Sequence, residues 1–223
     1  MDKGPCEGML LGGVDEAGRG CVLGPLAVAG VSVESERLQE LVELGVRDSK
    51  LLSPAQRDAL YPEILKICKG VQVSRVPPRM IDRYVSRGKK YRRLNYLETI
   101  HMAKVIDALG VDQVFIDAPD VNPVRFTAEL VELLTCKPKI VAEHKADVNY
   151  PVVSAASIVA KVERDRDVAD LRAIHGDFGS GYPSDPDTIA FLESWMKSNS
   201  SRPEFARKSW KTWNRIAVFA TLD

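Results

Sequence analysis

Four carboxylates follow runs of residues that the sequence pattern predicts to be strands. Asp15 and Glu16 close the first apolar run, Asp117 closes the run VFID, and Asp147 comes just past the run PKIVAEHKA. If those strands are parallel neighbours, their carboxyl ends meet at one edge of a sheet, where the ligand sites of open α/β sheets lie. Carboxylates gathered there repel one another unless cations bind between them. Oxygen donors without cysteine or histidine suit the hard cations Mg²⁺ and Mn²⁺.

Two such ions, about 3.5–4 Å apart, can catalyse an in-line displacement at a phosphodiester. One ion activates the attacking water and the other stabilises the leaving oxygen. Most single acids are solvated surface groups, so the pattern alone leaves both a metal site and four solvated carboxylates open. A fifth acid, Asp120 in the stretch DAPDVNP, could be a further ligand, but the stretch favours a role in shaping a turn before Pro123.

A Gly-Arg-Gly turn comes directly after the first two acids. Gly18 and Gly20 lack a Cβ, so the backbone there can approach a nucleic acid closely. Arg19 can bind a phosphate with two parallel hydrogen bonds. Backbone amides and carbonyls at such a turn can reach a ribose 2′-OH, the group that separates RNA from DNA. From the residues alone, a plain connection between strands stays open as the alternative.

The elements that would position these residues alternate between strands and helices. Two strands joined by a glycine-rich connection are expected to pair antiparallel, and a capping box with Ser53, Pro54 and Gln56 starts a helix. A second long helix is expected to end at Gly110, and a later one to run from Ser154 to about residue 174. The pattern predicts strands over 9–15, 25–34, 70–76, 112–117 and 138–147, and helices over 53–68, 92–109, 123–134 and 154–174.

This order predicts an α/β protein. Three leading strands form a meander and two more are joined through helices, which gives a mixed five-stranded sheet flanked by helices. The residues after about 181 read as a C-terminal helical and basic extension. We therefore expect a single catalytic domain over 1–223, with a core at about 9–180 and the extension at about 181–223.

Composition excludes several classes of protein. The 223 residues carry a formal net charge of zero, which argues against binding nucleic acid by charge alone. The four cysteines form no C-x-x-C pair, which disfavours a zinc site and indicates reduced thiols. No apolar run approaches the roughly 20 residues that span a bilayer, and the apolar part of the N-terminus is too short for a signal peptide. We expect a cytoplasmic protein without a membrane segment.

Basic residues offset the acids locally. The stretches 83–93 and 207–215 interleave bases with aromatic side chains, a composition that suits a groove tracking a nucleic-acid backbone. A solvated helical face stays open for each stretch. Ser154 is expected to open a helix, where it could lie near a phosphate, act as the N-cap, or do both. Lys161 and Arg164 share a helix face with Ser157 and could steer phosphate or pair with neighbouring acids.

Six blocks of the chain resemble those of ribonuclease HII in its archaeal form. The resemblance covers about residues 9–212 and is carried by GGVDEAGRGCVLGPLAVAGV, DSKLLSPAQR, FIDAPD, KADVNYPVVSAASIVAKVERD, GSGYPSDP and RKSWKT. It implies a ribonuclease H-like fold and endonucleolytic cleavage of RNA in an RNA–DNA hybrid, or at a ribonucleotide embedded in duplex DNA. It also implies cutting on the 5′ side of the ribonucleotide, by two-metal catalysis with Mg²⁺ or Mn²⁺, leaving 3′-hydroxyl and 5′-phosphate ends.

The resemblance also implies roles for single residues. The metal-binding and catalytic acids of the family fall on Asp15, Glu16, Asp117 and Asp147. It also implies that Lys50 contacts a phosphate and that Tyr182 takes part in reading the ribose. With the contacts expected from the residues themselves, the expected substrate-binding set is Gly18, Arg19, Gly20, Lys50, Ser154 and Tyr182.

Partners and rival functions follow from the same comparison. We expect a monomer that binds RNA–DNA hybrids and ribonucleotide-containing DNA, with no membrane partner. A sliding-clamp peptide would be expected near the C-terminus, but AVFATLD lacks a clear glutamine-led version. One rival is another nuclease on the same fold, such as a resolvase or transposase core, which would cleave all-DNA junctions. A second rival is a non-catalytic binding module, which would fail to bind metal.

Overall fold

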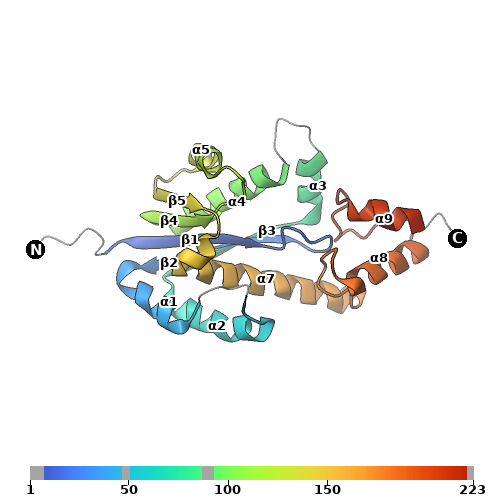
Figure 1. Cartoon of the computed structure of the whole chain (residues 1–223), viewed down its shortest axis with the longest axis horizontal. Coiled ribbons are helices and arrows are strands. Elements are labelled where there is room, and N and C mark those ends of the chain that lie inside the picture. Colours follow the sequence, from blue (N-terminus) through green and yellow to red (C-terminus); the bar gives the residue numbers. More distant parts are fainter. Residues whose placement is uncertain (1–7, 47–50, 87–92, 220–223) are drawn as a thin grey trace, which may run out of the picture. The chain divides into compact units, whose positions relative to one another are not determined.

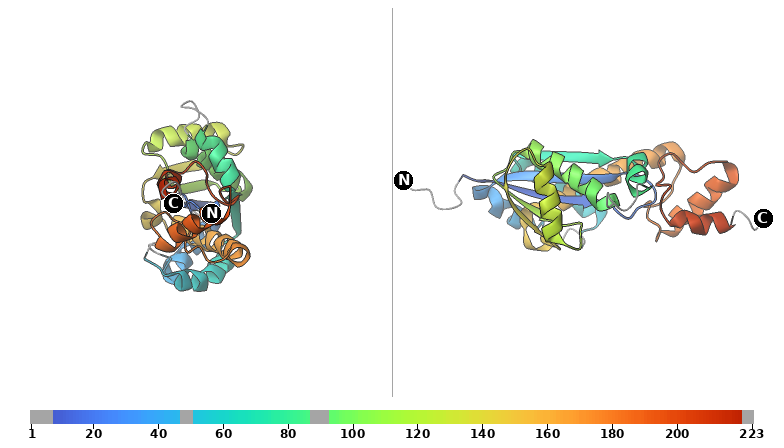
Figure 2. Two further views of the ribbon diagram at one scale, coloured as in Figure 1. Left: turned by 90° about the vertical axis from the view of Figure 1, so that its right-hand side faces the viewer. Right: turned by 90° about the horizontal axis from the view of Figure 1, so that it is seen from above.

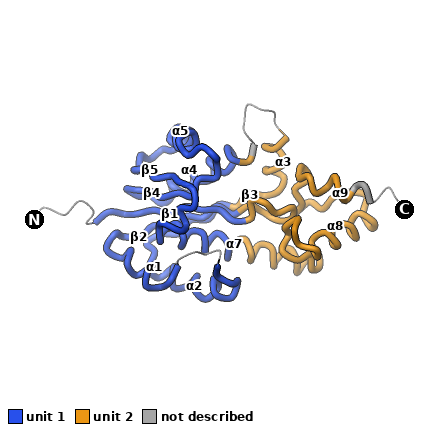
Figure 3. The backbone as a smooth tube through the Cα atoms, in the orientation of Figure 1, with its two compact units in different colours: residues 1–17, 27–74, 95–163 blue, residues 18–26, 75–94, 164–223 orange. Residues whose placement is uncertain are grey.

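The computed structural model describes residues 8–46, 51–86 and 93–219. They divide into two compact units, coloured separately in Figure 3. Unit 1 comprises residues 1–17, 27–74 and 95–163, and unit 2 comprises 18–26, 75–94 and 164–223. The single catalytic domain expected from the sequence stays a prediction, and each unit is described by itself below.

Unit 1 is built on a mixed five-stranded sheet in the order β3-β2-β1-β4-β5, as predicted. β1 pairs antiparallel with β2 and parallel with β4, and β4 pairs parallel with β5. The carboxyl ends of β1, β4 and β5 therefore lie at the same edge. The strands are β1 (Leu10–Ala17), β2 (Leu26–Glu34), β3 (Gly70–Val76), β4 (Gln113–Asp117) and β5 (Lys139–Glu143).

Helices cover both faces of this sheet. Figures 1 and 2 show α4 (Arg93–Leu109) and α5 (Pro123–Leu133) on one face. The opposite face carries α1 (Leu38–Leu44), α2 (Pro54–Ile67) and the first half of α7 (Pro151–His175). Two short elements complete the unit, the 3₁₀ helix η1 (Ser35–Arg37) and α6 (Ala146–Asn149).

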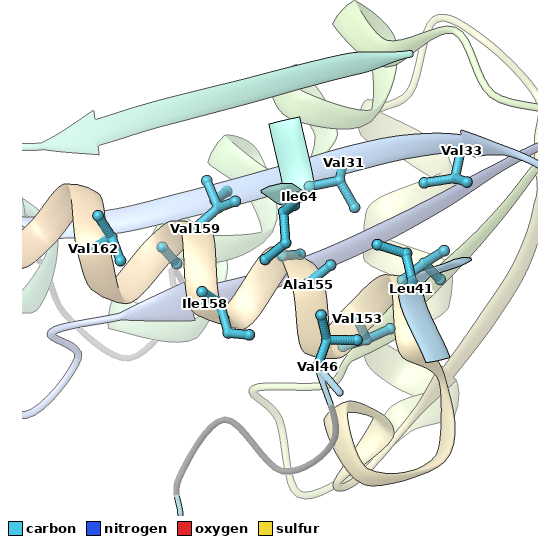
Figure 4. Packing of buried hydrophobic residues seen from close by; sticks show 14 of the residues in the cluster. Val31, Val33, Leu41, Val46, Ile64, Val153, Ala155, Ile158, Val159 and Val162 are labelled. Carbon is cyan, nitrogen blue, oxygen red and sulfur yellow. The ribbon is translucent and has the colours of Figure 1, made fainter. Parts of the chain in front are cut away.

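The two faces of the sheet bury separate apolar clusters because side chains alternate along β2. Val31 and Val33 pack with Ile64 of α2, Leu41 of α1 and Ile158 of α7, as Figure 4 shows. Val28, on the other face, packs in the cluster formed with α4 and α5. β2 therefore reads as a continuous apolar run because both of its faces are buried.

Two glycines let helices approach the sheet closely, one on each face. A Cβ at Gly13 of β1 would lie 2.1 Å from the carbonyl oxygen of Val152, in the first turn of α7. A Cβ at Gly30 of β2 would lie 2.5 Å from Cγ1 of Val105 on α4. The absence of a side chain at Gly13 brings the start of α7 directly against β1.

Several boundaries agree with the sequence and two do not. The capping box of Ser53 and Gln56 is present at α2, and Asp120 accepts the amide of Asn122 in the predicted turn. The prediction that Ser154 opens a helix was wrong, because α7 begins at Pro151 and the Ser154 amide donates to the Tyr150 carbonyl. The predicted strand 138–147 is too long, because β5 ends at Glu143 and the chain then turns into α6.

Unit 2 contains the C-terminal helices and has its own core. Its helices are α3 (Pro78–Ser86), the second half of α7, α8 (Pro186–Ser198) and α9 (Thr212–Phe219). Leu23 and Ala206 form an isolated antiparallel β-bridge. Both belong to an apolar cluster that also contains Phe178, Leu192 and Trp213. The C-terminal helical extension predicted from the sequence is thus present. Within the residues that the structure describes, no helix is both long and apolar enough to cross a membrane.

Candidate active site

Three of the four predicted carboxylates come together in unit 1. Asp15 lies on β1, Asp117 ends β4, and Asp147 lies on α6. Each offers one carboxylate oxygen, and these three oxygens all lie within 4.8 Å of one another. The convergence follows from the parallel pairing of β1, β4 and β5, as the positions of the acids along the chain predict.

The electrostatics of this cluster favour a cation. Asp15 is only 6% exposed and Asp147 only 1% exposed. Burial, with a contribution from the charge of Asp117, raises the pKa of Asp15 to about 6. The donor set is oxygen only and carries several negative charges in a buried place, which is the chemistry of a site for Mg²⁺ or Mn²⁺. The residues present therefore fit a divalent cation.

Two hydrogen-bonded side chains on α7 partly offset the effect of burial on the Asp15 carboxylate. The Lys161 ammonium donates to the Ser157 hydroxyl, and that hydroxyl bonds to the Asp15 carboxylate. Both contacts lower the pKa of Asp15 against the larger effect of burial. The sequence placed Lys161 and Ser157 on one helix face but did not connect them to Asp15. Their i, i+4 spacing predicts that the two side chains are neighbours on the helix. The sequence does not show that this face of the helix points toward Asp15.

A left-handed residue sets the position of Asp147. Lys145 has φ 59°, in a region that residues other than glycine rarely adopt, and it turns the chain from β5 into α6. Its amide donates to Oδ1 of Asp117 at 2.8 Å. This hydrogen bond ties the β5–α6 connection to the end of β4, which places Asp147 next to Asp117.

Glu16 differs from the other three acids. Neighbouring residues of a strand point to opposite faces of the sheet. Asp15 pairs with Ala29, and Glu16 pairs with Val28, which belongs to the cluster on the α4 face. Among the described residues, the group of converging carboxylates does not include Glu16. Its metal-binding role stays a prediction.

The Gly-Arg-Gly turn belongs to unit 2. Gly18 has φ 83°, and a Cβ there would lie 2.8 Å from the Pro25 carbonyl oxygen, so only glycine fits without strain. The Tyr182 ring lies 3.8 Å from where a Cβ of Gly20 would be. The guanidinium of Arg164 lies 4.9 Å from the centre of the same ring. Unit 2 therefore brings together the turn and the tyrosine that were predicted to contact substrate.

The remaining predicted contacts fare differently. Lys50 and most of the basic stretch 83–93 lie outside the described residues. Ser154 is 1% exposed inside α7, which disfavours a phosphate contact, so that contact stays a prediction. Arg164 pairs with Asp165, one of the two roles foreseen for it. Arg207 is fully buried, so its side chain lies neither on a solvated helical face nor in an open groove, the two alternatives for the stretch 207–215.

Comparisons with known proteins decide the family. The family model for Ribonuclease HII matches residues 12–213. This chain belongs to the ribonuclease HII family. The Ribonuclease HII of Cenarchaeum symbiosum is 46% identical over 203 residues, which cover 91% of this chain and 96% of that protein. That of Thermococcus kodakarensis is 46% identical over 211 residues, 94% of this chain and 90% of that protein.

Solved structures agree with this membership. The crystal structure of the ribonuclease H2 from Pyrococcus horikoshii has a TM-score of 0.87 at 36% identity, covering 96% of this chain and 100% of that one. The ribonuclease HII in a PCNA complex from Archaeoglobus fulgidus has a TM-score of 0.82 at 43% identity, covering 91% and 96%. The predicted ribonuclease H-like fold is thus confirmed. As a member of the ribonuclease HII family, the chain is an endonuclease that acts on the RNA strand of RNA–DNA hybrids.

Proposed function

We propose that this member of the ribonuclease HII family cleaves on the 5′ side of ribonucleotides in hybrids and in duplex DNA, leaving 3′-hydroxyl and 5′-phosphate ends. Two divalent cations, Mg²⁺ or Mn²⁺, are bound by Asp15, Glu16, Asp117 and Asp147. The observation that carries the proposal is the group of three carboxylate oxygens within 4.8 Å of one another. For Glu16, the family resemblance is the support.

The chain's own residues hold and orient the charged groups of the reaction. Bound cations supply activation of the attacking water and stabilisation of the leaving oxygen. Asp117 and Asp147 present their oxygens from β4 and α6, and the Lys145 amide fixes the orientation of Asp117. Ser157 and Lys161 orient the Asp15 carboxylate, since one hydroxyl bonds to it and is itself held by the ammonium. No nucleophile from the protein is required.

Recognition of the ribose is proposed for the turn in unit 2. Gly18 and Gly20 offer backbone that can approach the 2′-OH, and Arg19 binds a phosphate. Tyr182 packs its ring beside Gly20 and stacks on the sugar or base at the cleavage position. The positive φ of Gly18 and the place of the Tyr182 ring beside Gly20 support these roles. The phosphate contact of Lys50 rests on the family resemblance. That of Ser154 stays a prediction without the helix N-terminus expected to support it, because α7 begins at Pro151.

A sliding clamp is proposed as a partner from a structural relative. The Archaeoglobus fulgidus relative was solved as a complex with PCNA. The C-terminal sequence AVFATLD of this chain carries no glutamine-led clamp motif, and residues 220–223 lie outside the described part. A monomer in solution remains the expectation.

One assay tests the proposed cleavage. A labelled DNA duplex with a single ribonucleotide is incubated with and without Mg²⁺, beside a continuous hybrid and an all-DNA duplex. The expected result is one Mg²⁺-dependent cut on the 5′ side of the ribonucleotide, with a 3′-hydroxyl end and no cut in the all-DNA duplex. A 2′,3′-cyclic phosphate end would mean that the 2′-OH attacks, and cleavage of all-DNA junctions would favour the rival nuclease.

A further inference from the structure

The three carbonyl groups of the Gly-Arg-Gly turn are each held by the segment Arg207–Trp210. Nη2 of Arg207 donates to the Gly18 oxygen at 2.6 Å, and Nη1 of Arg207 donates to the Arg19 oxygen at 2.7 Å. Nε1 of Trp210 donates to the Gly20 oxygen at 3.3 Å. All of these residues belong to unit 2. The conformation of the turn therefore depends on side chains almost 190 residues away in the sequence.

Arg207 is buried and makes further bonds to the same loop. Its exposed fraction is 0%, its Nε donates to the Gly24 oxygen at 3.3 Å, and its Nη2 lies 2.8 Å from the Cys21 sulfur. Its guanidinium also stacks on Trp210 at 5.0 Å from the ring centre. A planar fork with five donors can serve several carbonyls at once, which an ammonium group cannot do in the same geometry.

Asp82 on α3 holds this segment in turn. Its carboxylate accepts three hydrogen bonds: from the Lys208 amide at 2.9 Å, from the Ser209 amide at 2.9 Å and from the Ser209 hydroxyl at 2.6 Å. The two amides follow Arg207 directly in the chain. Hydrogen bonds from Asp82 thus hold the backbone at 208–209, which continues covalently into Arg207, and the Arg207 side chain hydrogen-bonds to the turn.

We propose that Arg207 and Asp82 are positioning residues that set the selectivity of this enzyme for an isolated ribonucleotide. They act through the Gly18–Gly20 turn and do not themselves touch the substrate. This role rests on the ribose-reading function proposed above for the turn. Arg207 fixes the carbonyls of Gly18 and Arg19, and Asp82 fixes the backbone that carries Arg207.

Two substrates separate positioning from plain stability. A duplex with one ribonucleotide offers a single 2′-OH, so a displaced turn has no second position at which to bind. A continuous hybrid offers several neighbouring 2′-OH groups, so the loss of one well-placed contact is a smaller share of its binding. A misplacement of about 1 Å can cost about 100-fold in rate. The ratio of kcat/KM on the two substrates therefore reports the position of the turn.

The test compares Arg207→Lys and Asp82→Asn with the wild type, each checked for its thermal unfolding midpoint. Arg207→Lys keeps the charge and removes the fork, and Asp82→Asn keeps the shape and removes the charge that holds the amides. The expected result is a fall of about 10-fold to 100-fold in kcat/KM on the single-ribonucleotide duplex. On the continuous hybrid the fall should stay within about threefold. The effect of Asp82→Asn should be the smaller of the two, because it acts through one more step.

A matched control is Glu204→Gln, which removes one charge from an exposed carboxylate near the same segment and should leave the ratio unchanged. Equal losses on both substrates, or an unchanged ratio in a folded variant, would overturn the positioning role. If Arg207→Lys does not fold, Asp82→Asn decides by the same ratio. A wild type that does not cut the single-ribonucleotide duplex would overturn the proposed function itself, before any variant is compared.

Discussion

Asp15 is a buried carboxyl group whose neighbours act on it in opposite directions. Burial raises its pKa to about 6, and the charge of Asp117 acts in the same direction. The Ser157 hydroxyl and the Lys161 ammonium act against this rise. A bound divalent cation would favour the ionised form strongly, because an opposite charge at contact distance stabilises a carboxylate. The carboxylates of the cluster therefore repel one another when no cation is bound, and a bound cation would relieve this repulsion.

This repulsion gives a prediction for Asp15→Asn. Without divalent cations the variant should be more stable than the wild type by on the order of 1 kcal/mol, a rise of about 2–4 °C in the unfolding midpoint. Mg²⁺ should stabilise the wild type by mass action and the variant far less. Cleavage should be lost while binding of hybrid survives. Thermal unfolding with and without Mg²⁺, alongside an activity assay and a hybrid-binding assay, tests all of this.

The control for Asp15→Asn is Asp58→Asn, a change at an exposed acid of α2. That variant should keep the response of the wild type to Mg²⁺. Cleavage by Asp15→Asn at saturating Mg²⁺, or equal stabilisation of both proteins by Mg²⁺, would contradict the proposed role of Asp15.

At the residue scale, the grouping of the acids could be predicted because it depends on where strands end. The contacts that depend on the direction of a side chain could not be predicted. The acids at positions 15, 117 and 147 could be grouped because each follows a strand of a parallel set. The strand period of two already separates Glu16 from Asp15, but only the structure shows which face each one meets. The buried fork of Arg207 was unpredictable, because its partners are almost 190 residues away in the chain.

At the scale of elements, the contact of α7 with β1 positions Asp15 against Ser157. Gly13 permits this contact, since a Cβ there would lie 2.2 Å from the Val152 carbonyl carbon and 2.6 Å from the Val153 nitrogen. Both atoms are backbone, so the clash cannot be relieved by a rotamer change. Any side chain at position 13 must displace the helix from the strand.

Gly13→Ala should therefore destabilise the protein by about 1–3 kcal/mol, the usual range for overpacking, and reduce cleavage further through the shift of Ser157. Gly12→Ala is the matched control in the same strand, because the three atoms nearest to its Cβ would be side-chain atoms of Val111, at 3.0–3.4 Å. Urea unfolding and kcat measure the two effects. Equal stability of the two variants would show that α7 does not approach β1 as closely as described.

A buried histidine on α4 links stability to pH. The Nδ1 of His101 lies 2.8 Å from the Ser74 hydroxyl, and burial, with the charge of Lys104, lowers the pKa of His101 to about 4. Between pH 6.5 and 4 the unfolded chain binds a proton there that the folded chain does not, so stability falls as the pH falls. This term is about 2–3 kcal/mol across the window.

His101→Gln should remove this term. The variant should lose less stability than the wild type between pH 7 and pH 4, by about 2–3 kcal/mol. Urea unfolding at several pH values gives the comparison, and other titrating groups cancel in the difference. Parallel stability curves for the two proteins would exclude His101 as the source.

Element boundaries were predictable where local chemistry marks them. Ser53, Pro54 and Gln56 gave the start of α2 because capping is a contact between neighbours. The start of α7 differs from the prediction because Pro151, a residue favoured at the first helical position, begins the helix three residues before the serine. The end of β5 was misplaced because the left-handed turn at Lys145 has no glycine to mark it.

For the whole molecule, the order of strands and helices was enough to predict the class of fold. A meander followed by two strands joined through helices fixes a mixed sheet, because parallel neighbours need crossover connections. The division into two units could not be predicted from the sequence, because unit 2 is formed by three separate segments of the chain. Such a unit is defined by contacts between distant parts of the chain, and periodicity reports only neighbours.

The central claim is that Asp15, Asp117 and Asp147 bind a divalent cation. Calorimetric titration of the whole protein with Mg²⁺ tests it most directly, with Asp117→Asn as the variant and Asp58→Asn as the control. The account predicts saturable binding to the wild type and the control, and at least about a tenfold loss of affinity in Asp117→Asn, or about 1.4 kcal/mol. Absence of saturable binding to the wild type, or unchanged affinity in Asp117→Asn, would contradict it.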